Sequence, residues 1–232
     1  MKLSILAAGI VALASAASVG AVTVDVHDGY TVTYDEGTIL GTTSFSFSGG
    51  SGAVGFGWNL TSDINVVSLG SSESAVFNLP DFTITANPGY TLSGSLSGFL
   101  GNLVYNEVGS GATTSASATA DVSVDLAGLI SVGGSLDRVE SVSIPSANVS
   151  SGYYGSTTTV PAGSFSSFSV SNFVLTLNAS GGAYSSILAQ PQNELSVSFF
   201  ATPVPEPETY AMMLAGIGLI AAIARRRKHS GA

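Results

Sequence analysis

The fold is decided by two short runs near the start of the chain, in which apolar and polar residues alternate: Val22-Thr23-Val24-Asp25-Val26 and Tyr30-Thr31-Val32-Thr33-Tyr34. Alternation with a period of two places every second side chain on the same face of a β-strand. Asp28-Gly29, between the two runs, is a turn signal. The runs therefore predict two strands that each turn one face towards a core.

The same pattern continues along the chain. Alternating or apolar runs occur at residues 44–48, 54–58, 82–86, 120–126, 139–144, 173–177 and 195–199. The turn signals between them include Ser48-Gly49-Gly50, Asn87-Pro88-Gly89, Gly133-Gly134 and Gly181-Gly182. No long helical pattern separates the strands, which favours an all-β domain over residues 22–202, an antiparallel β-sandwich or jelly-roll-like fold.

Three segments of this domain fit the pattern less well. Residues 110–119 and 150–159 are rich in Ser, Thr and Ala, and few of their side chains could anchor a core, so we predict long hairpins or mobile loops there. Residues 184–189 are a candidate for a short helix.

Composition and charge exclude several classes of protein. The chain has 232 residues and no cysteine, so neither a disulfide framework nor a thiolate site is available and stability must come from packing. Arg138 is the only Lys or Arg between residues 22 and 203, whereas thirteen of the fifteen Asp and Glu residues lie there. Such a surface repels phosphate backbones, so we expect no binding to nucleic acid.

The N-terminus has the organisation of a secretory signal peptide. Met1-Lys2 is followed by an apolar run over residues 3–13 and then by small residues. Cleavage could follow Ala16 or Ala21, and the sequence does not choose between them. We therefore assign residues 1–21 to the signal peptide and expect the general secretory translocon and signal peptidase as partners.

The C-terminus, residues 203–232, has three parts. Prolines in Pro203-Val204-Pro205-Glu206-Pro207-Glu208 predict an exposed, extended spacer. The apolar run 210–224 predicts a short transmembrane helix of roughly 23 Å, less than the ~30 Å hydrocarbon core. Arg225, Arg226, Arg227 and Lys228 follow and would stay cytoplasmic, which places the body outside the inner membrane.

This ending resembles the PEP-CTERM sorting signal of Gram-negative bacteria. Val204, Pro205, Glu206 and Pro207 match the motif, and the apolar helix and the arginine cluster follow in the same order. The resemblance implies recognition and removal of the tail by an exosortase, and an association with exopolysaccharide and biofilm matrix. The same tail is also called the "ice-binding protein C-terminal domain", a name that does not describe an activity of the tail.

Candidate catalytic groups are scarce. His27 is the only histidine outside the two targeting segments, and it is more simply an exposed surface residue than a catalytic base. A polysaccharide hydrolase would need two carboxylates across a cleft, for which Asp35-Glu36, Asp121 with Asp125, and Asp137 with Glu140 are weak candidates. We therefore expect no enzymatic activity.

Candidate ligand-binding residues are few. Asp25, Asp28, Asp35 and Glu36 surround the first hairpin and are the candidate ligands for calcium, the one cofactor considered. Trp58, the only tryptophan, is a candidate for stacking on a sugar, although a core position is the simpler interpretation. Thr31-Val32-Thr33 and Thr83-Ile84-Thr85 share no repeating register in the sequence, which argues against a flat ice-binding face.

The sequence thus predicts an exported structural or adhesive protein of the cell surface or the biofilm matrix. We expect its tail to hold it transiently as a single-pass protein of the inner membrane, with the body in the periplasm, before exosortase processing. The alternative is a surface module that binds carbohydrate or calcium, with exopolysaccharide as its partner. A polysaccharide hydrolase is the third hypothesis.

Overall fold

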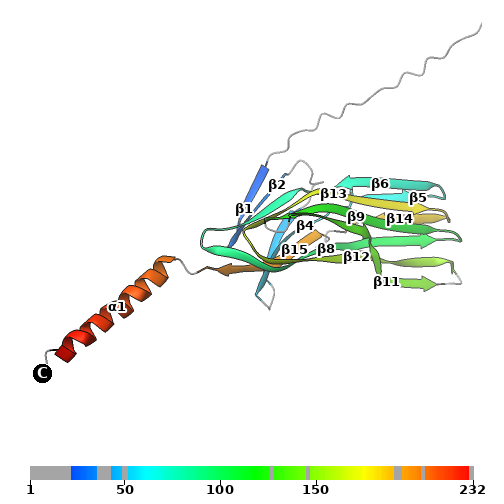
Figure 1. The fold of residues 1–232 in the computed structure, drawn as a ribbon. Helices are drawn as coiled ribbons and strands as arrows, with labels where there is room; N and C mark the ends of the chain where they lie inside the picture. Colours follow the sequence, from blue (N-terminus) through cyan, green and yellow to red (C-terminus); the bar gives the residue numbers. More distant parts are fainter. Residues whose placement is uncertain are drawn as a thin grey trace, which may run out of the picture.

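The computed structural model describes residues 22–35, 43–48, 52–125, 128–144, 147–190, 195–204 and 207–229 (Figure 1). The predicted signal peptide lies outside these residues. The described strands are β1 (Val22–Val26), β2 (Tyr30–Asp35), β3 (Thr43–Ser48), β4 (Ala53–Asn59), β5 (Asn65–Ser68), β6 (Ser72–Asn78), β7 (Phe82–Ala86), β8 (Tyr90–Val108), β9 (Thr113–Val124), β10 (Gly128–Ser135), β11 (Asp137–Ile144), β12 (Val149–Phe165), β13 (Ser167–Ser180), β14 (Tyr184–Leu188) and β15 (Leu195–Pro203). The described helix is α1 (Pro207–His229).

The described strands form two antiparallel sheets. Sheet A has the order β1-β2-β7-β13-β9-β10, with β6 beside β13. Sheet B has the order β11-β12-β8-β15-β4-β3, with β14 between β8 and β5. The long strands β8 and β13 each change partner midway: β8 pairs first with β15 and then with β14, and β13 pairs first with β7 and then with β6. The predicted antiparallel β-sandwich is thus the observed architecture.

The core lies between the sheets and is rich in aromatic rings. Trp58 of β4 packs against Phe56 at 5.0 Å, against Phe82 at 4.9 Å and against Tyr34 at 5.5 Å between ring centroids. Tyr30 and Val32 of β2 are also buried, which confirms the inward face predicted from the alternating run. The hairpin that decides the fold therefore contributes directly to the core.

The outcome for the three less regular segments of the body is mixed. For the two Ser/Thr/Ala-rich stretches, the long-hairpin alternative is confirmed and the mobile-loop alternative is wrong, because residues 113–119 begin β9, which forms a hairpin with β10, and residues 150–159 lie within β12, which forms a hairpin with β11. Residues 184–188 form strand β14 and not a helix. In β9 the inward positions are small residues, namely Thr114, Ala116, Ala118 and Ala120, and these are buried against the opposite sheet.

The two Thr-x-Thr segments are also more closely related than the sequence suggested. Strands β2 and β7 are antiparallel neighbours, and their register places Thr31 opposite Thr85 and Thr33 opposite Thr83. Strand β13 adds Ser167 opposite Thr85 in the next position. The outer face of sheet A therefore carries ordered rows of hydroxyl groups. The pairing of β2 with β7 relates the two segments in space, which was not expected from the sequence.

Candidate functional site

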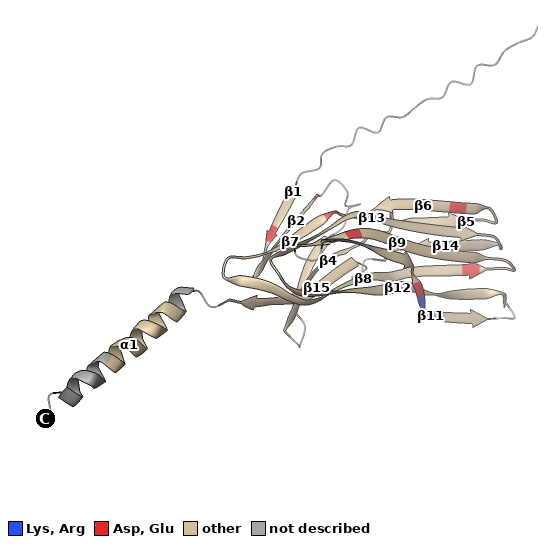
Figure 2. Cartoon of the chain, viewed as in Figure 1, with Lys and Arg blue, Asp and Glu red and all other residues tan. Residues whose placement is uncertain are grey.

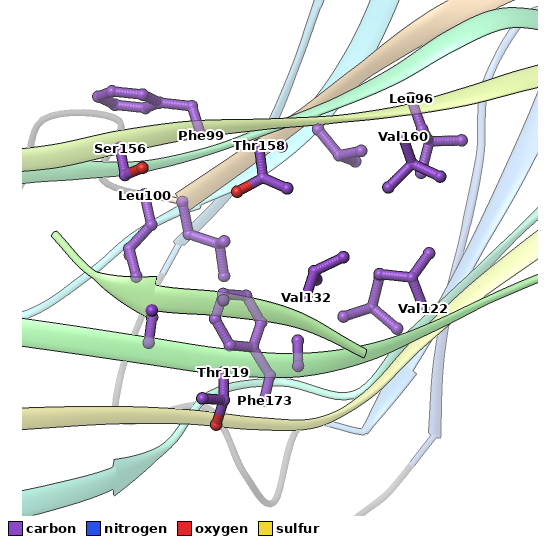
Figure 3. Close-up of a pocket in the computed structure, with 18 of the residues that line it drawn as sticks. Leu96, Phe99, Leu100, Thr119, Val122, Val132, Ser156, Thr158, Val160 and Phe173 are labelled. Carbon is purple, nitrogen blue, oxygen red and sulfur yellow. The ribbon is translucent and has the colours of Figure 1, made fainter. Parts of the chain in front are cut away.

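The sandwich is open along one side, between the edges of its two sheets. Strand β10 is the last strand of sheet A. In sheet B, β11 pairs with β12 only as far as Gly155, so residues 156–165 of β12 have β8 on one side and no described strand on the other. Between these two edges lies a cavity of about 190 Å³ (Figure 3).

The wall of the cavity is mostly apolar. Leu96, Leu100, Val122 and Val160 line it, and none of its lining residues carries a charge (Figure 3). An apolar wall of this kind gains dispersion contacts when an apolar group enters.

The cavity exists because small residues occupy inward positions in both sheets. Gly98 of β8 lies between the inward-facing Leu96 and Leu100, and a Cβ added to Gly98 would meet only the carbonyl oxygen of Thr158, at 4.0 Å. Ala118 and Ala120 of β9 line the wall formed by the other sheet. Larger residues at these positions would fill the space.

Hydroxyl groups gather at the mouth of the cavity. Ser135 of β10 and Thr158 of β12 are exposed and Ser156 is half-buried, and all three line the cavity. Figure 3 shows Ser156 and Thr158 side by side along β12, whereas the ring of Phe99 points away from the cavity. The site therefore combines an apolar interior with a neutral, hydrogen-bonding rim.

One end of the opening is closed where the chain crosses from sheet A to sheet B. Leu136, between β10 and β11, is buried against the cavity, and its N–H donates to the carbonyl oxygen of Ala116 at 2.8 Å. Two residues later lies Arg138, the only Lys or Arg of the body, and Figure 2 shows a single blue segment among the described strands. Its guanidinium contacts Glu107 of β8 with Nη2–Oε1 at 2.5 Å and Nη1–Oε2 at 3.3 Å. This bidentate pair fixes the crossing.

The ion pair is embedded in a polar cluster that joins both sheets. Thr114 of sheet A donates its N–H and its hydroxyl to Glu107 Oε1, at 2.7 and 2.8 Å. Arg138 Nε donates to the hydroxyl of Tyr154 at 3.1 Å, and the guanidinium lies 4.4 Å from the ring centroid of Tyr105. Burial lowers the pKa of Arg138, but its hydrogen bonds to Glu107 and Tyr154 and their charges raise the pKa overall, so the side chain stays protonated.

The outer face of sheet B carries a second, flatter feature. Phe45 and Phe47 of β3 lie opposite Gly57 and Gly55 of β4. A Cβ on Gly57 would lie 2.5 Å from Cζ of Phe45, and one on Gly55 would likewise collide with the ring of Phe47, so each ring lies across a glycine. The two ring centroids are 6.1 Å apart with 30° between their planes, and Phe47 is 38% exposed. We call this pair the Phe45–Phe47 platform.

Trp58 does not form part of any such surface. Its side chain is 1% exposed and lies among the aromatic rings of the core, so no ring face is available for a sugar. The candidate stacking role of Trp58 is therefore wrong. The Phe45–Phe47 platform was missed, although the alternation of Phe45 and Phe47 with serines, opposite a strand containing Gly55 and Gly57, could have indicated it.

The calcium candidates are not brought together. In the β1–β2 hairpin, Asp25 pairs with the inward-facing Val32, whereas Asp35 pairs with Val22 on the outer face. Asp28 lies in the turn, where it accepts a hydrogen bond from the Tyr90 hydroxyl at 3.0 Å that raises the pKa of Tyr90. Glu36 lies outside the described residues. Among the residues that the structure describes, no group of three or more Asp, Glu and His could hold a metal ion.

His27 is not the exposed surface residue that we expected. It is half-buried, and its ring stacks on Tyr30 with 4.8 Å between centroids and contacts Phe56 at 5.4 Å. Its Nε2 is buried without a hydrogen-bond partner within the described part of the chain.

The sorting tail begins where the sandwich ends. Pro203, the last residue of β15, still pairs with Tyr90 of β8, and the N–H of Val204 donates to the carbonyl oxygen of Gly89 at 2.7 Å. Pro205 and Glu206 lie outside the described residues, and α1 begins at Pro207. The extended spacer is therefore shorter than predicted, because its first residues belong to the sheet.

The helix predicted at residues 210–224 is present and longer, and it contains Arg225, Arg226, Arg227 and Lys228. In Figure 1 it points away from the sandwich. Within the described residues, no helix is both long and apolar enough to cross a membrane, so the predicted transmembrane span is not confirmed.

Comparison with known proteins identifies the tail. The family model of the PEP-CTERM protein-sorting motif matches residues 203–228. The chain therefore carries this motif, which implies export, association with the membrane before processing, and recognition by an exosortase. The position agrees with the resemblance recognised in Val204, Pro205, Glu206 and Pro207.

The body is not identified in the same way. No curated protein matches the chain by sequence. One solved structure, described as "Structural basis for the promiscuous specificity of the carbohydrate-binding modules from the beta-sandwich super family", is 10% identical to this chain, with a TM-score of 0.18. The match covers 79% of this chain and 94% of the other. A TM-score this low does not establish a shared fold.

Proposed function

We propose that this protein is a non-enzymatic structural or adhesive component of the cell surface or the extracellular biofilm matrix. The observation that carries the proposal is the junction between body and tail. The last strand of the sandwich ends at Pro203, directly before Val204-Pro205-Glu206-Pro207, and Val204 is the last residue hydrogen-bonded to the body in the described part of the chain. Cleavage after this point would release a complete sandwich.

The surfaces of the body support a role in contact with neutral, hydrated polymers. Rows of Thr and Ser hydroxyls cover part of the outer face of sheet A, and Ser196 and Ser198 occupy the outer face of β15 in sheet B beside the Phe45–Phe47 platform. The described cavity contains no carboxylate, and glycoside hydrolysis needs two. Binding and assembly are therefore better supported than catalysis.

The proposal is tested by the intact mass of the protein recovered separately from washed membranes and from the extracellular matrix of the native host. We expect the matrix form to lack everything beyond the Pro205-Glu206-Pro207 region. Detection of the full-length chain alone, and only in membranes, would contradict the proposal. A deletion strain with unchanged matrix, attachment and aggregation would contradict the structural role even if the tail is cleaved.

A second candidate function is a carbohydrate-binding surface module, and the Phe45–Phe47 platform favours it. Two neighbouring rings, inclined at 30° to each other on the outer face of the sheet, offer an apolar surface on which a sugar ring can stack. Exopolysaccharide of the host is the expected ligand. Affinity electrophoresis in gels containing that polysaccharide should show retardation that Phe47→Ala abolishes and that Val76→Ala, an exposed residue of sheet A, leaves unchanged. Equal retardation of both variants would exclude the platform.

A further inference from the structure

The cavity at the open edge has a mostly apolar wall without charged residues and is not used by the proposed function. We infer that it binds the alkyl chain of a neutral amphiphile, whose polar head remains at the mouth between β10 and β12. The inference rests on the size of the cavity, on the chemistry of its wall and on the arrangement of its rim.

Size limits the occupant to one hydrocarbon group. An engineered apolar cavity of about 150 Å³ binds benzene, so about 190 Å³ admits a chain of roughly six to eight carbons. A protein helix or strand would not fit. Because Gly98, Ala118 and Ala120 keep the interior open, the space is a consequence of the sequence at specific inward positions of β8 and β9.

Charge limits the head group. No lining residue is charged, so an ionised head drawn into the cavity would lose its hydration without gaining a partner. Arg138 is engaged with Glu107 and does not line the cavity. Ser135, Ser156 and Thr158 offer hydroxyl groups at the mouth, where a hydroxylated head could donate and accept hydrogen bonds. An alkyl chain attached to a sugar or another uncharged polyol meets all these conditions.

Trp58 provides a built-in reporter, because it is the only tryptophan of the chain. Its ring lies 4.9 Å from that of Phe82, and its backbone pairs with Leu195. Both neighbours line the cavity, although Trp58 itself does not. A chain that enters the cavity contacts residues next to Trp58, so its fluorescence should report occupancy of this site and not binding to the distant tail helix.

The test is a titration of the full-length chain with n-octyl β-D-glucoside below its micelle-forming concentration, followed by Trp58 fluorescence and calorimetry. We expect a saturable change. Gly98→Leu should weaken binding by more than about tenfold, because its side chain occupies the space of the alkyl group. Gly163→Leu is the matched control, since Gly163 is another strand glycine with open space around it but lies outside the cavity.

Thr158→Val tests the rim without filling the cavity. We expect roughly fivefold weaker binding, whereas Thr157→Val, on the opposite face of the same strand, should have no effect. Octanoate and octylammonium should bind at least about tenfold more weakly than the glucoside. No saturable fluorescence change, unaltered binding by both Gly98→Leu and Thr158→Val, or equal binding of the charged amphiphiles would each overturn the inference.

Discussion

Arg138 Nη2 lies 2.5 Å from Glu107 Oε1, at the point where the chain leaves sheet A and enters sheet B. Glu107 is 8% exposed and its oxygen also accepts two hydrogen bonds from Thr114 of the other sheet. The only cation of the body is therefore used to neutralise a buried carboxylate and to hold the two layers together at their open side. In a chain without cysteine, this polar cluster is one of the contacts that join the two sheets.

Arg138→Leu should destabilise the sandwich by about 2 to 3 kcal/mol. The substitution leaves Glu107 buried beside Thr114 without its opposite charge, and an uncompensated buried carboxylate is costly. The figure is below that for a fully buried pair because 36% of the Arg138 side chain is exposed to solvent. Urea unfolding of both proteins measures the difference.

The double variant Arg138→Leu/Glu107→Leu separates loss of the pair from loss of packing. It should recover most of the stability, because the buried charge is then removed as well. If the double variant is as unstable as Arg138→Leu alone, the aromatic contacts of Arg138 with Tyr105 and Tyr154 are the larger contribution.

Trp58→Ala should lower the free energy of unfolding by about 3 to 5 kcal/mol, because the indole fills the centre of the aromatic core. Thermal denaturation followed by circular dichroism measures the change. Phe99→Ala, on the outer face of sheet B, is a suitable comparison and should cost less. A Trp58→Ala protein with native stability that has lost polysaccharide binding would reverse this assignment.

Part of the fold follows from the sequence, because strands such as β2 alternate between buried and partly exposed residues. Each of the nine runs recognised by period two overlaps an observed strand. Strands β5, β6, β8 and β10 were not predicted. In β9, the inward residues Ala116, Ala118 and Ala120 are small and alternate with Ser and Thr, so the contrast between the two faces is weak. Their spacing was still two residues, and with that period taken as the criterion the strand could have been predicted.

The cavity was harder to predict from the sequence, because it depends on how strands that are distant in the sequence are arranged in space. Gly98 and Ala118 line one cavity only because β8 and β9 belong to opposite sheets at its open edge. The same applies to Thr31 and Thr85, whose register follows from the neighbouring positions of β2 and β7. The sorting tail could be recognised from the sequence, since Val204 and its neighbours form a motif of consecutive residues that does not depend on the fold.

Raising the pH above 10 should weaken the fold through Tyr30. Its hydroxyl is buried and donates to the carbonyl oxygen of Gly55 at 3.0 Å, and burial raises the pKa of Tyr30 to about 12. The folded protein thus keeps this proton when the unfolded chain has lost it. The stabilisation of the fold by protonated Tyr30 is fully present below pH 10 and disappears as the pH rises through 12. By pH 11.5 the free energy of unfolding should have fallen by about 2 kcal/mol.

The measurement is urea unfolding at pH 9 and pH 11.5 for the native chain and for Tyr30→Phe. Tyr30→Phe lacks the titrating hydroxyl, so its free energy of unfolding should fall between the two pH values by about 2 kcal/mol less than that of the native chain. Identical losses in the two proteins would mean that Tyr30 does not contribute to alkaline unfolding.

Adding calcium, or removing it with a chelator, should leave the melting temperature of the protein unchanged. Asp25 and Asp35 lie on opposite faces of the β1–β2 hairpin, and Asp28 is engaged by Tyr90 in the turn. A ligand that binds only the folded state raises the melting temperature, because it adds a stabilisation that grows with the logarithm of its concentration above the dissociation constant. Equal melting temperatures in calcium and in chelator are expected, and a melting temperature that rises with calcium concentration would contradict this prediction.

Gly57→Ala should destabilise the edge of sheet B by about 1 to 3 kcal/mol, the usual range for overpacking. The new methyl group would lie 2.5 Å from Cζ of Phe45 and would also collide with the backbone oxygen of Leu195. Phe45 can rotate away, but the oxygen of Leu195 belongs to the strand on the other side of β4. The double variant Gly57→Ala/Phe45→Ala should therefore remain less stable than Phe45→Ala alone.

Hydrogen exchange resolved by residue distinguishes the two effects, because loss of the ring contact exposes β3 only, whereas the backbone collision also opens the pairing of β4 with β15. Full recovery in the double variant would show that the ring of Phe45, lying across Gly57, is the sole reason for a glycine at this position.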